Sequence, residues 1–213
     1  MRRALVLLVL VTALAASGCG GGSEASASGC DNVAEPAPRK PKRYPPPRTR
    51  LDVTRTYVLN FRTSCGVFVV TLDTKLAPQT SASLVKLARR GYFENTIFHR
   101  IVPDFVIQGG DPTQTGGGGP GYWMRDVPPT DARYTKGTVA MAKTADEPAG
   151  LAGSQFFVVT AGDAGLPPDY AIVGKVTQGM DVVERIGRLG DANEQPTQTV
   201  LVRKVLVVSH PNS

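Results

Sequence analysis

Residues 97–112 read IFHRIVPDFVIQGGDP, and this stretch decides the interpretation of the chain. Alternation along a strand places Phe98 and Arg100 on one face, and the turn that follows brings Phe105 near them. A guanidinium group keeps its charge when it is buried, so an arginine among aromatic rings needs a partner or a ligand. Gln108 adds an amide that can both donate and accept a hydrogen bond. The pattern indicates a binding site built on strands.

Short β-rich runs extend from this stretch in both directions. Residues 57–61 and 67–72 flank a Cys65-Gly66 turn and predict a hairpin. The other predicted strands are residues 97–101, 105–108, 137–142, 155–160, 171–176 and 200–208. Helices are predicted from Pro78 to Gly91 and over residues 180–186. We therefore expect a mainly β fold, a closed eight-stranded antiparallel β-barrel flanked by two α-helices.

The N-terminal segment has the organisation of a secretory signal. Two arginines precede an apolar run at residues 4–16, which is shorter than the roughly 20 residues of a membrane-spanning helix. Residues 16–19 read ASGC and resemble the lipobox of bacterial lipoproteins. The resemblance implies that residues 1–18 are removed, that Cys19 carries a lipid, and that the protein is anchored to the bacterial membrane outside the cytoplasm. The alternative is an ordinary signal peptide that is cut nearby.

Export bears on the two remaining cysteines, Cys30 and Cys65. Disulfides persist in compartments outside the cytoplasm, and an even pair of thiols there favours one bridge. Two free thiols remain the alternative, because sequence gives no distances.

Residues 19–55 are interpreted as a tether rich in glycine and proline. Six prolines between residues 36 and 47 favour extended polyproline geometry. Seven basic residues and one acidic residue lie between 39 and 55, whereas from residue 56 onward 15 basic and 14 acidic side chains nearly cancel. The positive charge therefore belongs to a solvated basic spacer. The compartment and the lack of interleaved aromatic residues argue against nucleic acid as a partner.

Five ordered segments resemble the signature segments of cyclophilins. They are FHRIVP at 98–103, QGGD at 108–111, MA at 141–142, GSQFF at 153–157 and GKV at 174–176. The resemblance covers about residues 55–208, so a single cyclophilin-like domain is expected over residues 56–210. It implies isomerisation of X-Pro bonds in proline-containing polypeptides by a monomer.

The resemblance also implies roles for individual residues. Arg100 matches the catalytic arginine of the family, and Gln108 is expected to position the peptide and Arg100. The positions that match the substrate groove are Phe105, Val106, Ala142, Gln155, Phe157, Leu166 and Tyr170. Gly165 stands where many eukaryotic members have a tryptophan, so weak cyclosporin binding is expected.

Rotation about an amide bond breaks no covalent bond, so we expect neither a cofactor nor a metal ion. The barrier of about 18–20 kcal/mol arises from conjugation, and a hydrogen-bond donor that stabilises the nitrogen as its lone pair leaves conjugation lowers it. Two other interpretations are a proline-peptide binding module or holdase with little turnover, and a lipoprotein that presents a structural domain.

Overall fold

The computed structural model describes residues 28–212, so the predicted signal segment and Cys19 lie outside the described residues. This part of the chain forms two helices and eleven strands. The helices are α1 (Pro78–Arg89) and α2 (Met180–Gly187). The strands are β1 (Arg55–Thr63), β2 (Gly66–Leu72), β3 (Thr96–Ile97), β4 (Arg100–Val102), β5 (Val106–Gly109), β6 (Met124–Arg125), β7 (Thr138–Met141), β8 (Leu151–Ala152), β9 (Phe156–Val159), β10 (Ile172–Gln178) and β11 (Leu201–Pro211). Neither helix has the length and apolar character needed to cross a membrane.

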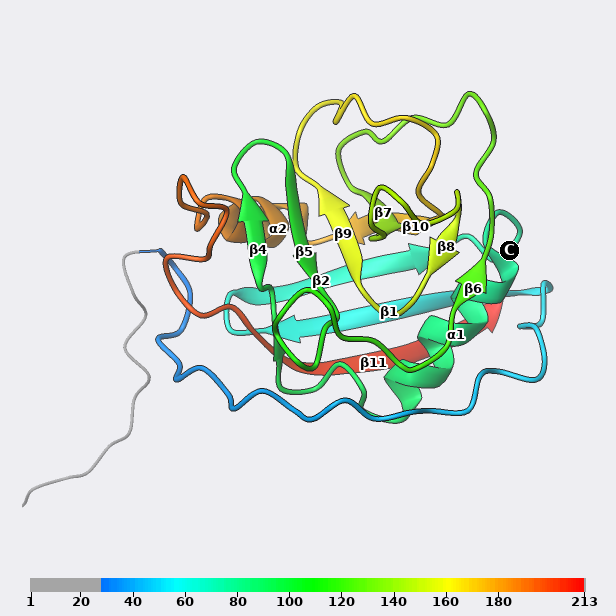
Figure 1. Ribbon diagram of the computed structural model, residues 1–213, viewed down its shortest axis with the longest axis horizontal. Coiled ribbons are helices and arrows are strands. Elements are labelled where there is room, and N and C mark those ends of the chain that lie inside the picture. The colour runs from blue at the N-terminus through cyan, green and yellow to red at the C-terminus, as the bar shows by residue number, and fades with distance from the viewer. Residues whose placement is uncertain (1–27, 213) are drawn as a thin grey trace, which may run out of the picture.

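Nine of these strands form one curled antiparallel sheet in the order β3-β11-β1-β2-β10-β7-β9-β5-β4 (Figure 1). The predicted hairpin is confirmed, since β1 and β2 pair from Val58 with Thr71 to Thr63 with Gly66. A second sheet of two short strands, β6 and β8, was not predicted. The mainly β fold with two helices is confirmed.

The expected closed barrel of eight strands is corrected to a curled sheet of nine. One strand was predicted at residues 97–101, but the chain breaks there into β3 and β4. β3 pairs with β11 and β4 pairs with β5, so the two strands are the opposite ends of the sheet order. The break at Phe98 and His99 arises because the chain leaves β11 and turns toward β5, which interrupts the hydrogen-bond ladder.

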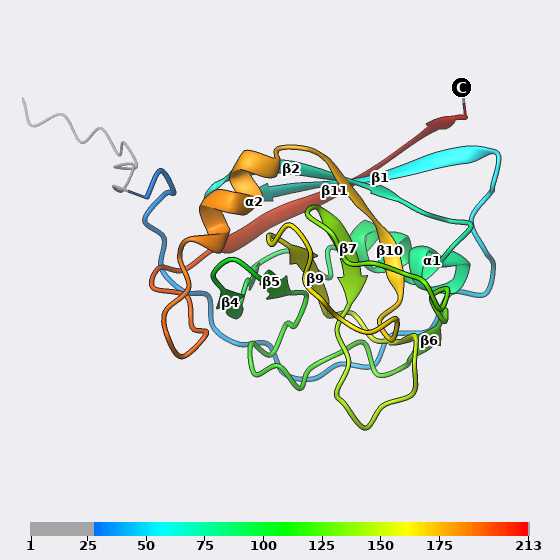
Figure 2. The same cartoon turned by 90° about the horizontal axis from the view of Figure 1, so that it is seen from above.

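Alternation in the hairpin builds the core. Leu59 and Phe61 of β1 and Phe68 and Val70 of β2 are buried, while the residues between them are more exposed. The Phe61 and Phe68 rings are stacked with their centroids 4.8 Å apart, a separation that is favoured for aromatic pairs. The same rings contact Phe156 of β9 and Phe98 across the fold, so this core lies inside the curled sheet, and Figure 2 shows the two helices at opposite ends of the sheet.

Helix α1 begins and ends for local reasons and is capped by a distant residue. Pro78 stands in its first turn, where the missing N–H is not needed, and Gly91 follows its end with a φ of 67°. No side chain of its own caps the N-terminus. The Asp126 carboxylate accepts hydrogen bonds from Thr80 N and Thr80 Oγ1, both at 2.7 Å, and so caps the helix from another part of the chain.

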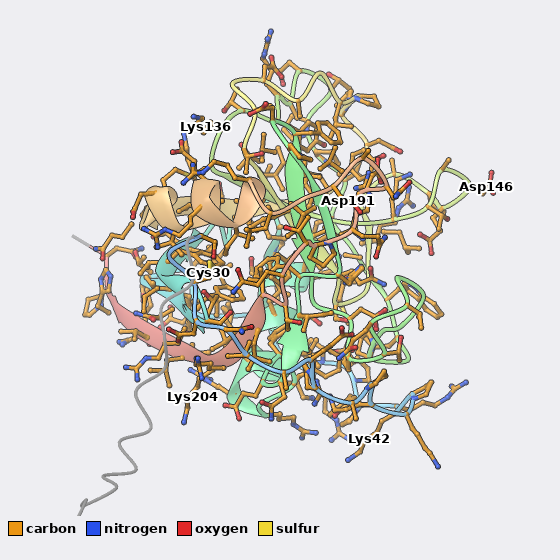
Figure 3. The ribbon with its side chains drawn as sticks, turned by 90° about the vertical axis from the view of Figure 1, so that its left-hand side faces the viewer. Cys30, Lys42, Lys136, Asp146, Asp191 and Lys204 are labelled. Atoms are coloured by element: carbon orange, nitrogen blue, oxygen red, sulfur yellow. A yellow bond between two sulfur atoms is a disulfide. The ribbon has the colours of Figure 1, made fainter. Side chains whose placement is uncertain are left out.

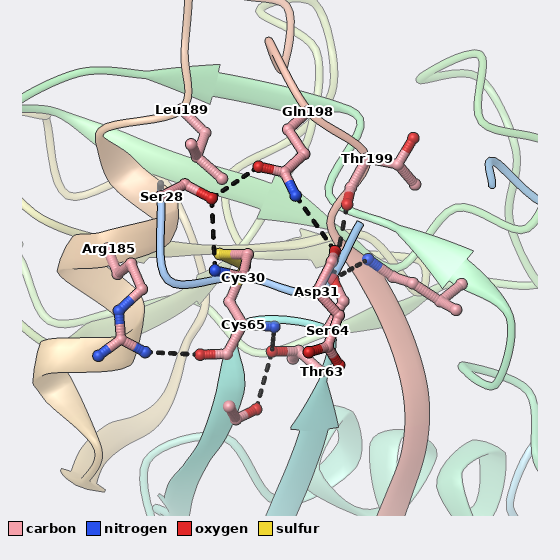
Figure 4. The surroundings of a disulfide bond; sticks show 12 residues. Ser28, Cys30, Asp31, Thr63, Ser64, Cys65, Arg185, Leu189, Gln198 and Thr199 are labelled. Atoms are coloured by element: carbon pink, nitrogen blue, oxygen red, sulfur yellow. Dashed lines mark hydrogen bonds between the residues drawn. A yellow bond between two sulfur atoms is a disulfide. The ribbon is translucent and has the colours of Figure 1, made fainter. Parts of the chain in front are cut away.

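A disulfide joins Cys30 to Cys65 with an S–S distance of 2.08 Å, the pairing that the sequence favours (Figure 4). Cys30 is fully buried, and the next residue, Asp31, donates its N–H to Ser64 O at 2.7 Å. Arg185 of α2 donates to Cys65 O at 2.7 Å. The start of the described chain is therefore fixed to the turn between β1 and β2.

Residues 31–50, here called the N-terminal arm, lie along the domain and are not a solvated spacer. Arg39 N donates to Pro112 O at 2.9 Å, and Tyr44 N donates to Pro120 O at 2.8 Å. The Tyr44 ring packs edge-on against a ring of the domain at a centroid distance of 5.1 Å. An extended proline-rich segment has no internal hydrogen bonds, so its remaining N–H groups are available to pair with a neighbouring loop.

We predict that replacing both Cys30 and Cys65 by alanine lowers the free energy of unfolding by about 2–4 kcal/mol, because the bridge restricts the unfolded chain. Guanidinium denaturation of the full chain measures the effect, with Cys19→Ala in both proteins so that no free thiol complicates it. Equal unfolding midpoints for the two proteins would contradict the prediction.

Candidate active site

The residues that the sequence predicts for the site all line one groove, with a volume of about 1170 Å³. They are Arg100, Phe105, Val106, Gln108, Ala142, Gln155, Phe157, Leu166 and Tyr170. The structure therefore brings together side chains that lie up to 70 positions apart in the sequence. Gly165 is next to the groove in sequence but does not line it.

The register of three neighbouring strands places the central residues. Arg100 of β4 lies opposite Gln108 of β5, and Gln108 in turn lies opposite Phe157 of β9. Residues that oppose each other in an antiparallel pair project from the same face of the sheet. The charged donor, the amide and the aromatic ring therefore form one row across the sheet.

A chain of hydrogen bonds orients Arg100. Its Nη1 donates to Gln108 Oε1 at 3.3 Å, and Gln108 Nε2 donates to Gln155 Oε1 at 3.1 Å. Gln155 Nε2 donates to the carbonyls of Gly116 and Gly118 at 2.7 and 2.9 Å. If either amide were flipped, its nitrogen would face a donor and its oxygen would face an acceptor, so the neighbouring groups fix the orientation of both amides. About a third of the Arg100 side chain is exposed, so it can still donate to a ligand in the groove.

The glycine-rich loop, residues 111–119, is held by one carboxylate. Asp111 is fully buried and accepts hydrogen bonds from the N–H groups of Thr113, Gly116 and Gly118 at 2.7–3.0 Å. Burial alone would raise the pKa of Asp111, but these N–H donors and the Thr113 hydroxyl hold it below its usual value. The loop is therefore the support on which Gln155 is fixed.

An apolar floor lies beside this polar row. Val106 and Phe157 are buried, and the Phe157 ring meets the Tyr170 ring edge-on at 5.6 Å. Phe105, Ala142 and Leu166 are partly buried and pack against the same cluster. The floor offers a surface suited to an apolar ring next to a charged donor.

Sequence reasoning missed Glu194, which forms an ion pair with Arg100. The Glu194 Oε2 atom accepts from Arg100 Nε at 2.6 Å, and Glu194 O accepts from Ile101 N at 2.9 Å. The loop that carries Glu194 is shaped by Asp191, whose Oδ1 accepts from the N–H groups of Asn193 and Gln195. Only this turn pattern is visible in the sequence, and it does not reveal a partner 94 residues away.

Sequence reasoning also missed the support of Tyr170. The Tyr134 hydroxyl donates to Tyr170 O at 2.7 Å and accepts from Tyr170 N at 3.0 Å. The Lys143 side chain is almost wholly buried, pairs with Asp169, and places its Nζ atom 5.3 Å from the centre of the Tyr170 ring. These contacts fix the backbone and the ring of Tyr170 at the wall of the groove.

His99 lies behind the polar row and is largely enclosed. Neither ring nitrogen has a hydrogen-bond partner among residues 28–212. The Gln155 amide lies beside the ring, but its nitrogen is committed to the loop carbonyls. Burial lowers the pKa of His99, the Asp111 carboxylate raises it, and the Arg100 charge lowers it, with a net decrease. His99 is therefore neutral in the folded protein near pH 7.

Within the described part of the chain, no group of three or more histidine, cysteine or acidic side chains is placed to hold a metal ion.

Comparisons with known proteins show what the whole domain is similar to. Residues 58–207 match the family model of cyclophilin type peptidyl-prolyl cis-trans isomerases. Peptidyl-prolyl cis-trans isomerase CYP18-2 of Arabidopsis thaliana is 36% identical over 155 residues, which cover 70% of this chain and 93% of the relative. Human peptidyl-prolyl cis-trans isomerase-like 1 is 41% identical over 147 residues, with coverages of 67% and 87%.

Solved structures give the same result. The crystal structure of a cyclophilin type isomerase from Cryptosporidium parvum has a TM-score of 0.65 and 30% sequence identity, and covers 74% of this chain and 99% of that protein. A structure of the Cryptosporidium protein in the presence of the dipeptide Ala-Pro has a TM-score of 0.64 and 29% identity, with coverages of 73% and 99%.

We predict that His99 makes stability depend on pH. Because its folded pKa lies below the unfolded value near 6.5, the unfolded chain binds the proton more tightly. Its contribution is complete above the unfolded pKa and is lost as the pH falls toward the folded pKa, with a slope of at most about 1.4 kcal/mol per pH unit. Urea denaturation between pH 7.5 and 5 measures the slope.

The matched variants are His99→Gln and His210→Gln, since His210 is the other histidine and is exposed. The first should flatten the dependence in this range and the second should leave it unchanged. Equal slopes in all three proteins would show that His99 is not the titrating group.

Proposed function

This chain belongs to the cyclophilin family and is a peptidyl-prolyl cis-trans isomerase, and we propose that it acts on exported polypeptides with Arg100 as its catalytic residue. One observation carries the proposed role of Arg100. Its guanidinium group is held by Gln108 and Glu194 beside the Phe157 floor and is still partly exposed to the groove.

The proposed mechanism begins with the placement of the proline ring. A proline ring resting on Val106 and Phe157 removes apolar surface from water and fixes one side of the X-Pro bond. The amides of Gln108 and Gln155 are suited to bind the peptide backbone on either side. With the flanking residues fixed, rotation is confined to the X-Pro bond itself.

Arg100 then acts on the electronic barrier. As the bond twists, the nitrogen lone pair leaves conjugation with the carbonyl and becomes a better hydrogen-bond acceptor. A donor that is already oriented stabilises this state more than the planar ground state, and that difference is what accelerates the rotation. No covalent bond forms or breaks, so the groove requires no nucleophile or proton carrier.

The proposal includes a location outside the cytoplasm. It rests on the signal-like residues 1–18, on the lipobox that ends at Cys19, and on the Cys30–Cys65 disulfide, because disulfides persist in oxidising compartments. The family match covers residues 58–207 and does not extend to this segment. In this proposal the lipidated segment leads into the N-terminal arm, and the isomerase domain follows from residue 56.

We predict that Arg100→Ala lowers kcat/KM for X-Pro isomerisation by about 10²–10³, because one preorganised donor is lost. Exchange spectroscopy on a short Ala-Pro peptide measures the rate. The matched control is Arg62→Ala, which removes an exposed arginine of β1 outside the groove and should keep full activity. Full activity of a well-folded Arg100→Ala protein would refute the assignment. A well-folded wild type that binds the peptide without accelerating exchange would indicate a holding module.

A second prediction concerns the anchor. In a bacterial host that processes lipoproteins, the wild-type chain should lose residues 1–18, gain the mass of a diacylglycerol, and partition into the detergent phase. Cys19→Ala should abolish both the added mass and the partitioning, because the thiol is the acceptor of the lipid. Recovery of the wild-type protein in the aqueous phase with an unmodified N-terminus would argue against the lipoprotein form.

A further inference from the structure

The groove has a wall that the family domain does not supply. Pro38, Arg39, Pro41, Lys42 and Arg43 of the N-terminal arm line it together with the site residues. The family match begins only at residue 58, so this wall is an addition specific to the N-terminal part of this chain. Figure 3 shows Lys42 on the arm, where it passes along the domain.

The arm is fixed in place by contacts within the chain. The Cys30–Cys65 disulfide holds its start, and its backbone N–H groups donate to the carbonyls of Pro112 and Pro120 at the two ends of the glycine-rich loop. The approach is close, since a Cβ atom at Gly121 would lie 2.8 Å from Arg43 Cγ. A wall that is ordered before the ligand arrives costs little entropy when the ligand binds.

Two of the three cations of this wall are exposed and lack an anionic partner. Lys42 and Arg43 are exposed, and no carboxylate lies within 4.0 Å of either among residues 28–212. The Lys42 Nζ atom lies 5.5 Å from the centre of the Tyr44 ring, which keeps it on the arm.

The other cations of the groove are already engaged. Arg100 pairs with Glu194, Lys143 pairs with Asp169, and Arg39 donates to the carbonyl of Tyr92. One acidic residue, Glu147, lines the groove in the described part of the chain, and it accepts a hydrogen bond from Thr144 N. The charges of the groove that form no ion pair with another described residue are therefore three cations of the arm and the single carboxylate of Glu147, so their net charge is positive.

We propose that Lys42 and Arg43 form a subsite for an acidic side chain of the substrate, so that the enzyme favours X-Pro bonds with Asp or Glu a few residues away. The inference rests on the proposed function, because it assigns the subsite to a polypeptide already held over Arg100. An extended polypeptide is the ligand whose chain can lie on the apolar floor and reach the arm, since both line the same groove. Charge complementarity of this kind acts on selectivity and on the rate of association.

The test uses Lys42→Glu/Arg43→Glu in the full chain. The substrates are Ala-Pro peptides in which one Glu is moved through the positions on either side of the proline, each paired with the same peptide carrying Gln. For the wild type at low salt, kcat/KM at the best position should be about threefold to tenfold higher with Glu than with Gln, and 0.5 M salt should reduce this ratio. The variant should lose or invert the ratio while keeping its activity on the Gln peptides.

The matched control is Lys40→Glu/Arg48→Glu, which changes the net charge equally at exposed arm residues that do not line the groove. It should keep the wild-type ratio. Loss of the ratio in this control, or a wild-type ratio near one at every position, would overturn the subsite. A third result would also overturn the subsite. If Lys42→Glu/Arg43→Glu left the rates on all peptides unchanged but abolished binding to anionic vesicles, the two cations would be assigned to a lipid surface.

Failure of the proposed function has a different signature. It would appear as a wild type that accelerates exchange of neither the Glu nor the Gln peptides. In that case the subsite is tested without turnover, by measuring the dissociation constants of the Glu and Gln peptides for the wild type and for the two variants. Equal constants for the Glu and Gln peptides with the wild type would overturn the subsite.

Discussion

The antiparallel register of β4, β5 and β9 is the constraint on which the site depends. It sets Arg100, Gln108 and Phe157 in one row, and the side chains of a strand alternate between its two faces. A slip of one residue in either pairing would turn part of this row away from the groove and expose core residues such as Ile101 and Ile107, which are fully buried. The burial of these two isoleucines therefore specifies the same register that the chemistry needs.

The orientation of Arg100 is set from outside the sheet as well as within it. Asp111 folds the glycine-rich loop, the loop carbonyls hold Gln155, and Gln155 holds Gln108. On the other side Glu194 holds Nε of the same guanidinium group. A partly exposed arginine would otherwise sample many rotamers, so these two supports lower the entropy that must be lost when it meets the twisted amide. The entropy of ordering the loop is lost during folding, when the buried carboxylate of Asp111 acquires its hydrogen-bond donors.

The sequence predicts the parts of the structure that depend on local pattern. Alternation in residues 57–72 gives the hairpin, and the FHRIVP and QGGD segments give Arg100 and Gln108. Glu194, Tyr134 and the Asp126 cap of α1 could not be found in this way, because each acts on a residue far away in the chain through a loop without regular pattern. The break between β3 and β4 was missed for a related reason, since it follows from the path between β11 and β5. A composition rich in proline and basic residues predicts an extended segment but does not show what that segment lies against.

The N-terminal arm links the covalent structure to the groove. Its first end is joined to the β1–β2 turn by the disulfide, and its second end continues into β1, so both ends are attached to the same sheet. A segment tethered at both ends loses much less conformational entropy on docking than a free tail, which allows a few backbone hydrogen bonds to hold it. The same tethering keeps Lys42 and Arg43 at a constant place beside the groove. The bridge between Cys30 and Cys65 therefore contributes to the order of the groove wall as well as to stability, since without it the arm would be attached to the sheet at one end only.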